Sequence, residues 1–129
     1  MAMLTEMVTG GKISESAYLC LKLAWIYRGE IQEAKANGAA QERISMYEKY
    51  EKEYLEDAYR GFKQARETEY PPIAGMDENT ITYLLTSIGI HCGKIDEARR
   101  YGSALLISRT ASMKLKNKTR DVLETIKKN

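Results

Sequence analysis

The sequence offers one adjacent pair of a base and a nucleophile, His91 and Cys92. Neighbouring residues on a helix point about 100° apart, so this imidazole and this thiol would not face each other. His91 is the only histidine, and a cysteine–histidine enzyme would therefore need Cys20 beside it. We expect instead a half-buried structural His91 and two reduced, buried cysteines. The sequence predicts no catalytic residue.

Motifs for a metal ion or a phosphate loop are absent from the sequence. Zinc sites use Cys and His at short spacings, and the sequence has no Cys-x-x-Cys. Acidic residues such as Asp96 and Glu97 form adjacent pairs, and no Asp-rich loop follows the calcium pattern. The stretch Gly10-Gly11-Lys12 lacks the first glycine and the final Ser or Thr of a phosphate loop. We expect no metal and no cofactor.

Basic residues gather towards the C-terminus. Seven basic residues stand against Asp121 and Glu124 between residues 109 and 129, a net charge of +5. One interpretation is a surface for phosphate or an acidic partner. The other, which we favour, is a solvated capping helix, because no aromatic residues are interleaved for base stacking and nucleic acid is therefore not expected. The candidate basic surface comprises Lys114, Lys116, Lys118 and Arg120.

The composition is that of one ordinary globular domain over residues 1–129, with 1–13 as a remnant or a short leading helix. Apolar residues make up 43% and charged residues 29%, and the net charge of +2 gives no strong pull towards nucleic acid or membrane. No stretch approaches the roughly 20 apolar residues that cross a bilayer. Residues 1–11 lack the basic start and apolar run of a signal peptide. We expect a cytoplasmic location and no membrane.

Apolar residues at spacings of three and four predict helices along the whole sequence. We expect the first long helix to follow a cap at Ser14 or Ser16 and to end near Arg28, because Gly29 loosens the backbone. A new helix could then start within residues 31–36. One extended helix with a charged outer face is predicted over Ala39–Glu69. The next helix is predicted over Asp77–Cys92, with Asp77 as N-cap and Gly93 as the left-handed terminator. The last two helices are predicted over Asp96–Ser108 and Ala111–Lys127.

Small and large residues recur in a pattern similar to the tetratricopeptide unit, a helix–turn–helix repeat of about 34 residues. Leu23-Ala24-x-x-Tyr27 resembles its first helix, and Ala58-x-x-x-Phe62-x-x-Ala65 resembles its second, with about twenty extra residues between them. The stretch Gly93–Ala98 resembles the turn of a second unit. This predicts an all-α, tetratricopeptide-like right-handed stack of antiparallel helix pairs, with five to six helices, one extended helix and a C-terminal capping helix.

Two sequence blocks resemble a bacterial family of uncharacterised proteins, the domain of unknown function numbered 2225. Residues 21–28, Leu-Lys-Leu-Ala-Trp-Ile-Tyr-Arg, look like one block of that family, and the stretch from Gly75 to Leu84 is similar to a second. Such proteins also carry an N-terminal segment with cysteines, which this sequence lacks. The resemblance therefore implies the C-terminal helical half and a tetratricopeptide-like fold, and it implies no activity.

In arrays of such repeats the first helix of each unit lines a concave groove. The residues that this implies for the groove are Tyr18, Leu21, Trp25, Arg28, Tyr83, Ser87 and His91. Trp, Tyr and Arg dominate binding energies at interfaces, although Trp25 and Tyr18 could instead fill the contact between units. We predict a non-catalytic module or scaffold that binds a protein or peptide and pairs with itself through the extended helix. The alternative is a nucleic-acid or acidic-ligand binder that uses the basic C-terminal helix.

Overall fold

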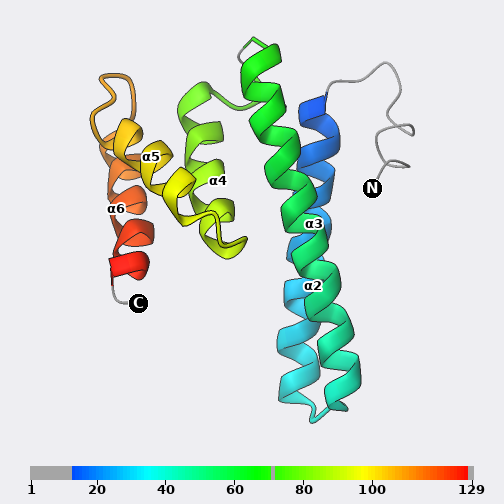
Figure 1. Cartoon of the computed structure of the whole chain (residues 1–129). Coiled ribbons are helices and arrows are strands. Elements are labelled where there is room, and N and C mark those ends of the chain that lie inside the picture. Colours follow the sequence, from blue (N-terminus) through cyan, green and yellow to red (C-terminus); the bar gives the residue numbers. More distant parts are fainter. Residues whose placement is uncertain (1–12, 71, 128–129) are drawn as a thin grey trace. The chain divides into compact units, whose positions relative to one another are not determined.

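The computed structural model describes residues 13–70 and 72–127, which form five α-helices and no β-strand. The predicted all-α fold is therefore confirmed, whereas the expected leading helix lies outside the described residues. One isolated β-bridge joins Ile73 and Met76 in a loop. No helix of the described residues is long and apolar enough to cross a membrane. The helices are α2 (Ile13–Ala36), α3 (Gln41–Thr68), α4 (Glu78–His91), α5 (Ile95–Leu106) and α6 (Met113–Lys127) (Figure 1).

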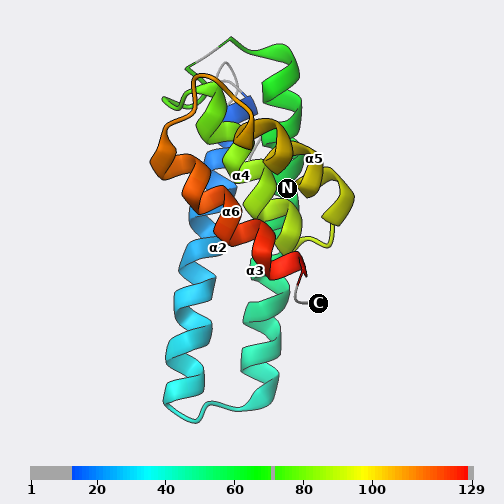
Figure 2. The ribbon, with the colours of Figure 1, turned by 90° about the vertical axis from the view of Figure 1, so that its left-hand side faces the viewer.

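Packing divides the protein into two compact units, and the boundary falls within α3, between Gly61 and Phe62. The first unit holds α2 and the part of α3 up to Gly61, which run side by side as a helical hairpin (Figures 1 and 2). The second unit holds the last turns of α3 together with α4, α5 and α6. The expectation of one domain over residues 1–129 stays a prediction.

The hairpin turn of the first unit is built around Gly38, whose φ of 68° is the left-handed value that glycine adopts at low cost. The Gly38 N–H donates to the Lys35 carbonyl at 3.3 Å, and the Ala39 N–H donates to the Ala34 carbonyl at 2.9 Å. This bonding pattern is a Schellman motif, which satisfies the last carbonyls of α2. After the turn, α3 runs unbroken to Thr68 and confirms the predicted extended helix.

Helix α2 is longer than the sequence predicts, because it continues through Gly29 to Ala36. A glycine within a helix costs up to about 1 kcal/mol relative to alanine, which packing can outweigh. Here Ile31 and Ala34 are buried with Ile44 of α3, so the last turns of α2 gain apolar contacts. The predicted break at Gly29 is therefore wrong. The caps expected at Ser14 or Ser16 are wrong too, since both serines lie buried inside α2.

Aromatic rings join the two helices of the hairpin. Tyr27 of α2 lies among three tyrosines of α3, with ring centroids 5.9 Å from Tyr47, 5.2 Å from Tyr50 and 5.9 Å from Tyr54. These partners follow one another along α3 at spacings of three and four residues, which places them on one face of the helix. Beside them, the Arg28 guanidinium pairs with Glu51 at 2.8 Å. Tyr27 therefore anchors α2 to this stretch of α3.

In the second unit, α4 and α5 form a helical pair and α6 packs against both of them. Gly93, with a φ of 78°, ends α4 as predicted, because its N–H and that of Lys94 donate back to Ile90 and Gly89. The last turns of α3 join this unit through an ion pair of 2.9 Å between Lys63 and Glu97. Its fully buried large side chains are Phe62, Ile73, Ile81, Leu85, Thr86, Leu105 and Thr119.

Candidate anion-binding pocket

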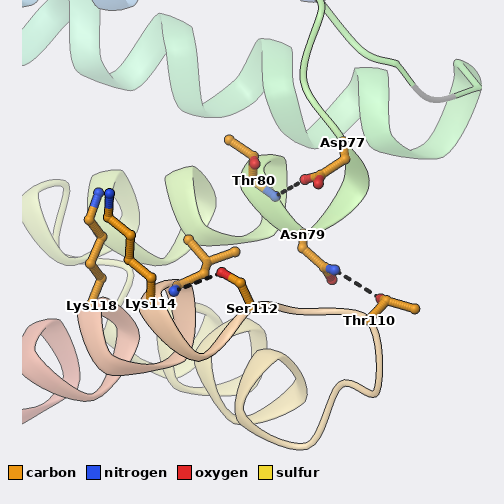
Figure 3. A pocket seen from close by; sticks show the side chains of 8 residues that line it. Asp77, Asn79, Thr80, Thr110, Ser112, Lys114 and Lys118 are labelled. Carbon is orange, nitrogen blue, oxygen red and sulfur yellow. Dashed lines mark hydrogen bonds between the residues drawn. The ribbon is translucent and has the colours of Figure 1, made fainter.

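A cavity of about 300 Å³ lies in the second unit, between the first turn of α4 and the first two turns of α6 (Figure 3). Most of the side chains around it carry hydroxyl, amide or charged groups, and two of them are lysines. A cavity on which several polar groups converge is a candidate binding site. The lining residues are Asp77, Asn79, Thr80, Thr110, Ser112, Lys114, Leu115 and Lys118.

Asp77 forms the α4 side of the pocket and caps that helix, as the sequence predicted. Its carboxylate accepts a hydrogen bond of 2.8 Å from the Thr80 backbone N–H, the bond that a helix N-cap makes. Hydrogen bonds from the side chain and backbone of Thr80 lower the pKa of Asp77 below its ordinary value. Asp77 is therefore a fixed negative charge at neutral pH, at one edge of the cavity.

Ser112 forms the opposite side and caps α6. Its hydroxyl accepts a hydrogen bond of 3.1 Å from the Leu115 N–H, and its carbonyl accepts one of 3.0 Å from the Lys116 N–H. These bonds fix the start of α6 and so determine where its first lysines point. The first turn of α6 contains no acidic residue, although the positive end of the helix dipole favours one there.

Asn79 connects the two sides of the pocket. Its amide nitrogen donates to the Thr110 hydroxyl at 2.9 Å, and its amide oxygen accepts from the Ser108 hydroxyl at 3.4 Å. The Ser108 oxygen also accepts from the backbone N–H groups of Thr110 and Ala111, each at 3.2 Å. The loop between α5 and α6 is thus tied to the first turn of α4, and the width of the cavity is fixed by side chains.

Lys114 and Lys118 line the cavity from α6, and both side chains extend towards α4 (Figure 3). They are one turn apart, a spacing at which like charges repel by a few tenths of a kcal/mol. The ion pairs among the described residues involve other side chains, so no carboxylate neutralises either lysine within 4 Å there. The pocket therefore has two lysine charges at its wall that are available to an anion.

The other two residues of the candidate basic surface lie elsewhere. Arg120 borders a separate cavity of about 430 Å³ between α5 and α6, together with Arg99 and Leu123. Its guanidinium donates to the Asn117 side chain at 2.9 Å. Lys116 is half-buried and lines neither cavity. The helical repeat of 100° per residue explains this division, because alternate residues of a helix point in different directions.

The groove predicted from the repeat resemblance draws on α2 and α4. On α2, Leu21 is 2% exposed and belongs to the core, so it is not available to line an open groove. Tyr18 is half-buried with the Lys22 ammonium 4.6 Å from its ring centre, and Trp25 is 48% exposed. Arg28 is held by Glu51. Trp25 is thus the most accessible aromatic ring of the α2 set.

On α4, Tyr83 and Ser87 are half-buried, and His91 is exposed at the end of the helix. The expectation of a half-buried His91 is therefore wrong, because the helix stops there and Gly93 turns the backbone. Cys20 is buried as predicted, and Cys92 is only half-buried. The groove that would combine the α2 and α4 residues stays a prediction. Among the described residues, no three His, Cys, Asp or Glu side chains are grouped to hold a metal ion.

Sequence reasoning identified Lys114 and Lys118 but missed the residues that position them. Asn79, Thr110 and Ser112 are ordinary loop and cap residue types, and nothing in the sequence pairs α4 with the α5–α6 loop. One signal was available, because Ser112 precedes a helix whose first turn carries a lysine and no acid. A positive helix end with added positive charge is a local conflict of the kind found at binding sites.

Comparison with known proteins identifies a family. The model of a protein family described as "Uncharacterized protein conserved in bacteria (DUF2225)" matches residues 1–126. No curated protein and no solved structure matches the sequence. The family resemblance seen in the sequence is confirmed, and the tetratricopeptide-like character of the fold stays a prediction.

Proposed function

Because the protein belongs to the bacterial family DUF2225, whose description names no activity, we propose a function from the α4–α6 pocket: a non-catalytic module that binds a carboxylate group of a protein partner. The observation that carries this proposal is the pair of lysines, Lys114 and Lys118, that line one polar cavity with no described carboxylate within 4 Å of either ammonium. This refines the predicted protein-binding or scaffold role, and it uses part of the basic C-terminal helix.

The energetic argument rests on charges that the fold leaves uncompensated. Lys114 and Lys118 repel each other, and Lys114 lies in the first turn of α6, at the positive end of the helix dipole. A carboxylate placed between them offsets this repulsion and forms a charge-assisted hydrogen bond with each ammonium, worth about 0.2–1 kcal/mol apiece because both lysines are exposed. The Thr110 hydroxyl, which accepts from Asn79, also lines the cavity, whereas the Thr80 hydroxyl already donates to Asp77. An acidic ligand therefore gains more here than on an ordinary lysine-bearing surface.

The charge of the pocket favours a carboxylate over a phosphate or a nucleic acid. Asp77 contributes one negative charge beside two positive ones, so the site suits a monoanion better than a phosphate dianion. A nucleic-acid surface needs basic residues spread along the backbone path, whereas Arg120 lies at another cavity. An Asp or Glu side group, or the free carboxyl terminus of a peptide, fits this arrangement. Cys20, a buried thiol, is compatible with the cytoplasmic location that we propose for this binding.

The test measures binding of a fluorescein-labelled hexaglutamate peptide by anisotropy, with a hexaglutamine peptide as the uncharged comparison. We expect the double variant Lys114→Ala/Lys118→Ala to lose roughly three- to thirtyfold in affinity, because it removes two exposed charge-assisted bonds. The matched control is Lys49→Ala/Lys52→Ala, which removes the same charge from exposed positions on α3. Equal weakening by both double variants would reduce the effect to net charge and contradict the proposal.

Competition distinguishes the ligand classes. A short peptide with a free carboxyl terminus and no acidic residue should displace the labelled peptide if a single carboxylate is sufficient. Inorganic phosphate or single-stranded DNA that competes better than this peptide would contradict the carboxylate assignment. The amide signals of Thr80 and Leu115, which flank the cavity, should shift in an NMR titration. Shifts confined to other helices would place binding elsewhere.

A further inference from the structure

The outer face of α2 carries large apolar side chains that the first unit does not bury. Trp25 is 48% exposed and Ile26 is 58% exposed. Lys22 and Gly29 share this face, because residues three and four apart on a helix are neighbours. Exposed side chains of this size grouped on one helix are typical of an interaction surface. We define the outer α2 face by the residues Lys22, Trp25, Ile26, Gly29 and Glu33.

Gly29 lies at the middle of the outer α2 face, and none of the residues that the structure describes packs against the position of its missing side chain. A Cβ built on it would have no heavy atom within 4 Å. Glycine lowers the stability of a helix relative to alanine, so a glycine here has a cost without an intramolecular gain. The absence of a side chain does leave an open strip of backbone between bulky neighbours. Another helix can approach closely at such a point.

We propose that two copies of this protein pair through the outer α2 face, with the two α2 helices antiparallel. Lys22 and Glu33 are eleven residues apart, about 16 Å along a helix. A two-fold axis midway between them sets Lys22 of one copy opposite Glu33 of the other, and it does so twice. The same axis sets Ile26 opposite Gly29. Each copy thus supplies both the apolar side chain and the open strip of backbone that receives it, as an isologous interface requires.

The charge pattern identifies a second copy as the occupant. Within the described residues, Lys22 and Glu33 take no part in an ion pair. Their opposite signs at equal distances from one point make the face complementary to itself. The exposed residues of α3 in the first unit are mostly charged, among them Glu42, Arg43, Lys49, Lys52 and Glu53. We therefore favour pairing through α2, while the predicted pairing through the extended helix, on which Met46 and Tyr50 are exposed, stays a prediction.

The test follows the dimer by sedimentation velocity across a range of protein concentrations. Wild type should form a reversible dimer. Lys22→Glu and Glu33→Lys should each raise its dissociation constant by roughly tenfold or more, since each creates two like-charge contacts. An equimolar mixture of these two variants should dimerise again, because every contact then joins opposite charges. Single variants that dimerise like wild type, or a mixture that stays monomeric, would overturn the proposal.

Trp25 gives a second measurement, since it is the only tryptophan. Its emission should move to shorter wavelength as wild type is concentrated and should become less accessible to acrylamide. Gly29→Leu should abolish this change by filling the open strip, without affecting helix content measured by circular dichroism. A wild-type protein that stays monomeric at every concentration would overturn the proposal. So would Gly29→Leu dimerising as strongly as wild type.

Discussion

Gly61 of α3 lies directly against Ala17 of α2. A Cβ built on Gly61 would lie 2.6 Å from the Ala17 Cβ and 3.3 Å from its Cα, well inside ordinary contact distance. Ala17 is itself 2% exposed, so neither the backbone of α2 nor that methyl group has room to move aside. The two helices therefore approach closely because the only glycine of the extended helix meets one of the smallest side chains of its partner.

Gly61→Ala should destabilise the first unit. Alanine favours a helix over glycine by up to about 1 kcal/mol, but the steric overlap with Ala17 should cost about 1–3 kcal/mol and prevail. The unfolding free energy from urea titration checks the sign. Gly29→Ala is the matched control, because nothing lies near its added Cβ. Gly29→Ala should stabilise the fold when it is measured at concentrations where the protein is monomeric. A stabilising effect of Gly61→Ala would contradict the close packing of Gly61 against Ala17.

Tyr27→Ala should weaken the hairpin of the first unit by about 1–3 kcal/mol, less than for a fully buried aromatic side chain because Tyr27 is half-buried. The ring contacts three tyrosines of α3, and Tyr27→Phe keeps all three contacts. The phenylalanine variant should therefore remain close to wild type in thermal unfolding. Tyr70→Ala serves as the surface control, because Tyr70 is 90% exposed. Comparable losses in Tyr27→Phe and Tyr27→Ala would show that the hydroxyl, and not the ring, supports the hairpin.

Helix ends were predictable where a capping residue stands at the end itself. Asp77 and Gly93 mark the start and the end of α4, as the sequence indicates, because an N-cap side chain and a left-handed glycine act within one turn of the helix end. The continuation of α2 through Gly29 was not predictable in this way. It depends on Ile31 and Ala34 packing against Ile44, a contact between residues that the local pattern cannot pair.

The candidate site was predictable only in part for the same reason. The charge count along α6 identifies Lys114 and Lys118, whose spacing puts them on one face. Their separation from Arg120 follows from the positions of α4 and α5 around α6, which a charge count does not contain. Leu21 is the opposite case: the repeat resemblance placed it in a groove, whereas packing in the core buries it.

Alkaline pH should destabilise the first unit through Cys20. Burial raises the pKa of this thiol from an ordinary value of 9.0 to about 11, and the nearby Asp57 adds to the rise. The folded state therefore favours the neutral thiol over the thiolate. This preference contributes on the order of 2 kcal/mol to the free energy of unfolding; the contribution is complete below pH 9 and is lost as the pH rises to about 11. Denaturant titrations of wild type and Cys20→Ala check this.

The Cys20→Ala comparison isolates the thiol from the tyrosines and lysines that titrate in the same range. The variant should lose less stability than wild type between pH 9 and pH 11, although a small cavity lowers its stability at pH 7. Alkylation by iodoacetamide offers an independent readout, since a buried neutral thiol reacts only when the fold opens. Identical pH dependence in the two proteins would contradict a raised pKa for Cys20.

Asn79→Ala should weaken the pocket without unfolding the second unit. The variant loses the hydrogen bond of 2.9 Å to Thr110 and the longer one to Ser108, each worth about 0.5–1.5 kcal/mol. Because these bonds hold the α5–α6 loop, amide hydrogen exchange should accelerate at residues 108–112 and stay unchanged in the buried turns of α4 around Leu85.

The affinity of Asn79→Ala for the hexaglutamate peptide should fall even though both lysines of the pocket remain, because their positions relative to α4 become less defined. Asn117→Ala is the control, since Asn117 bonds Arg120 on another side of α6. It should leave both the affinity and the exchange of the α5–α6 loop as in wild type. Unchanged exchange in the loop of Asn79→Ala, together with full affinity, would show that Asn79 does not position the site.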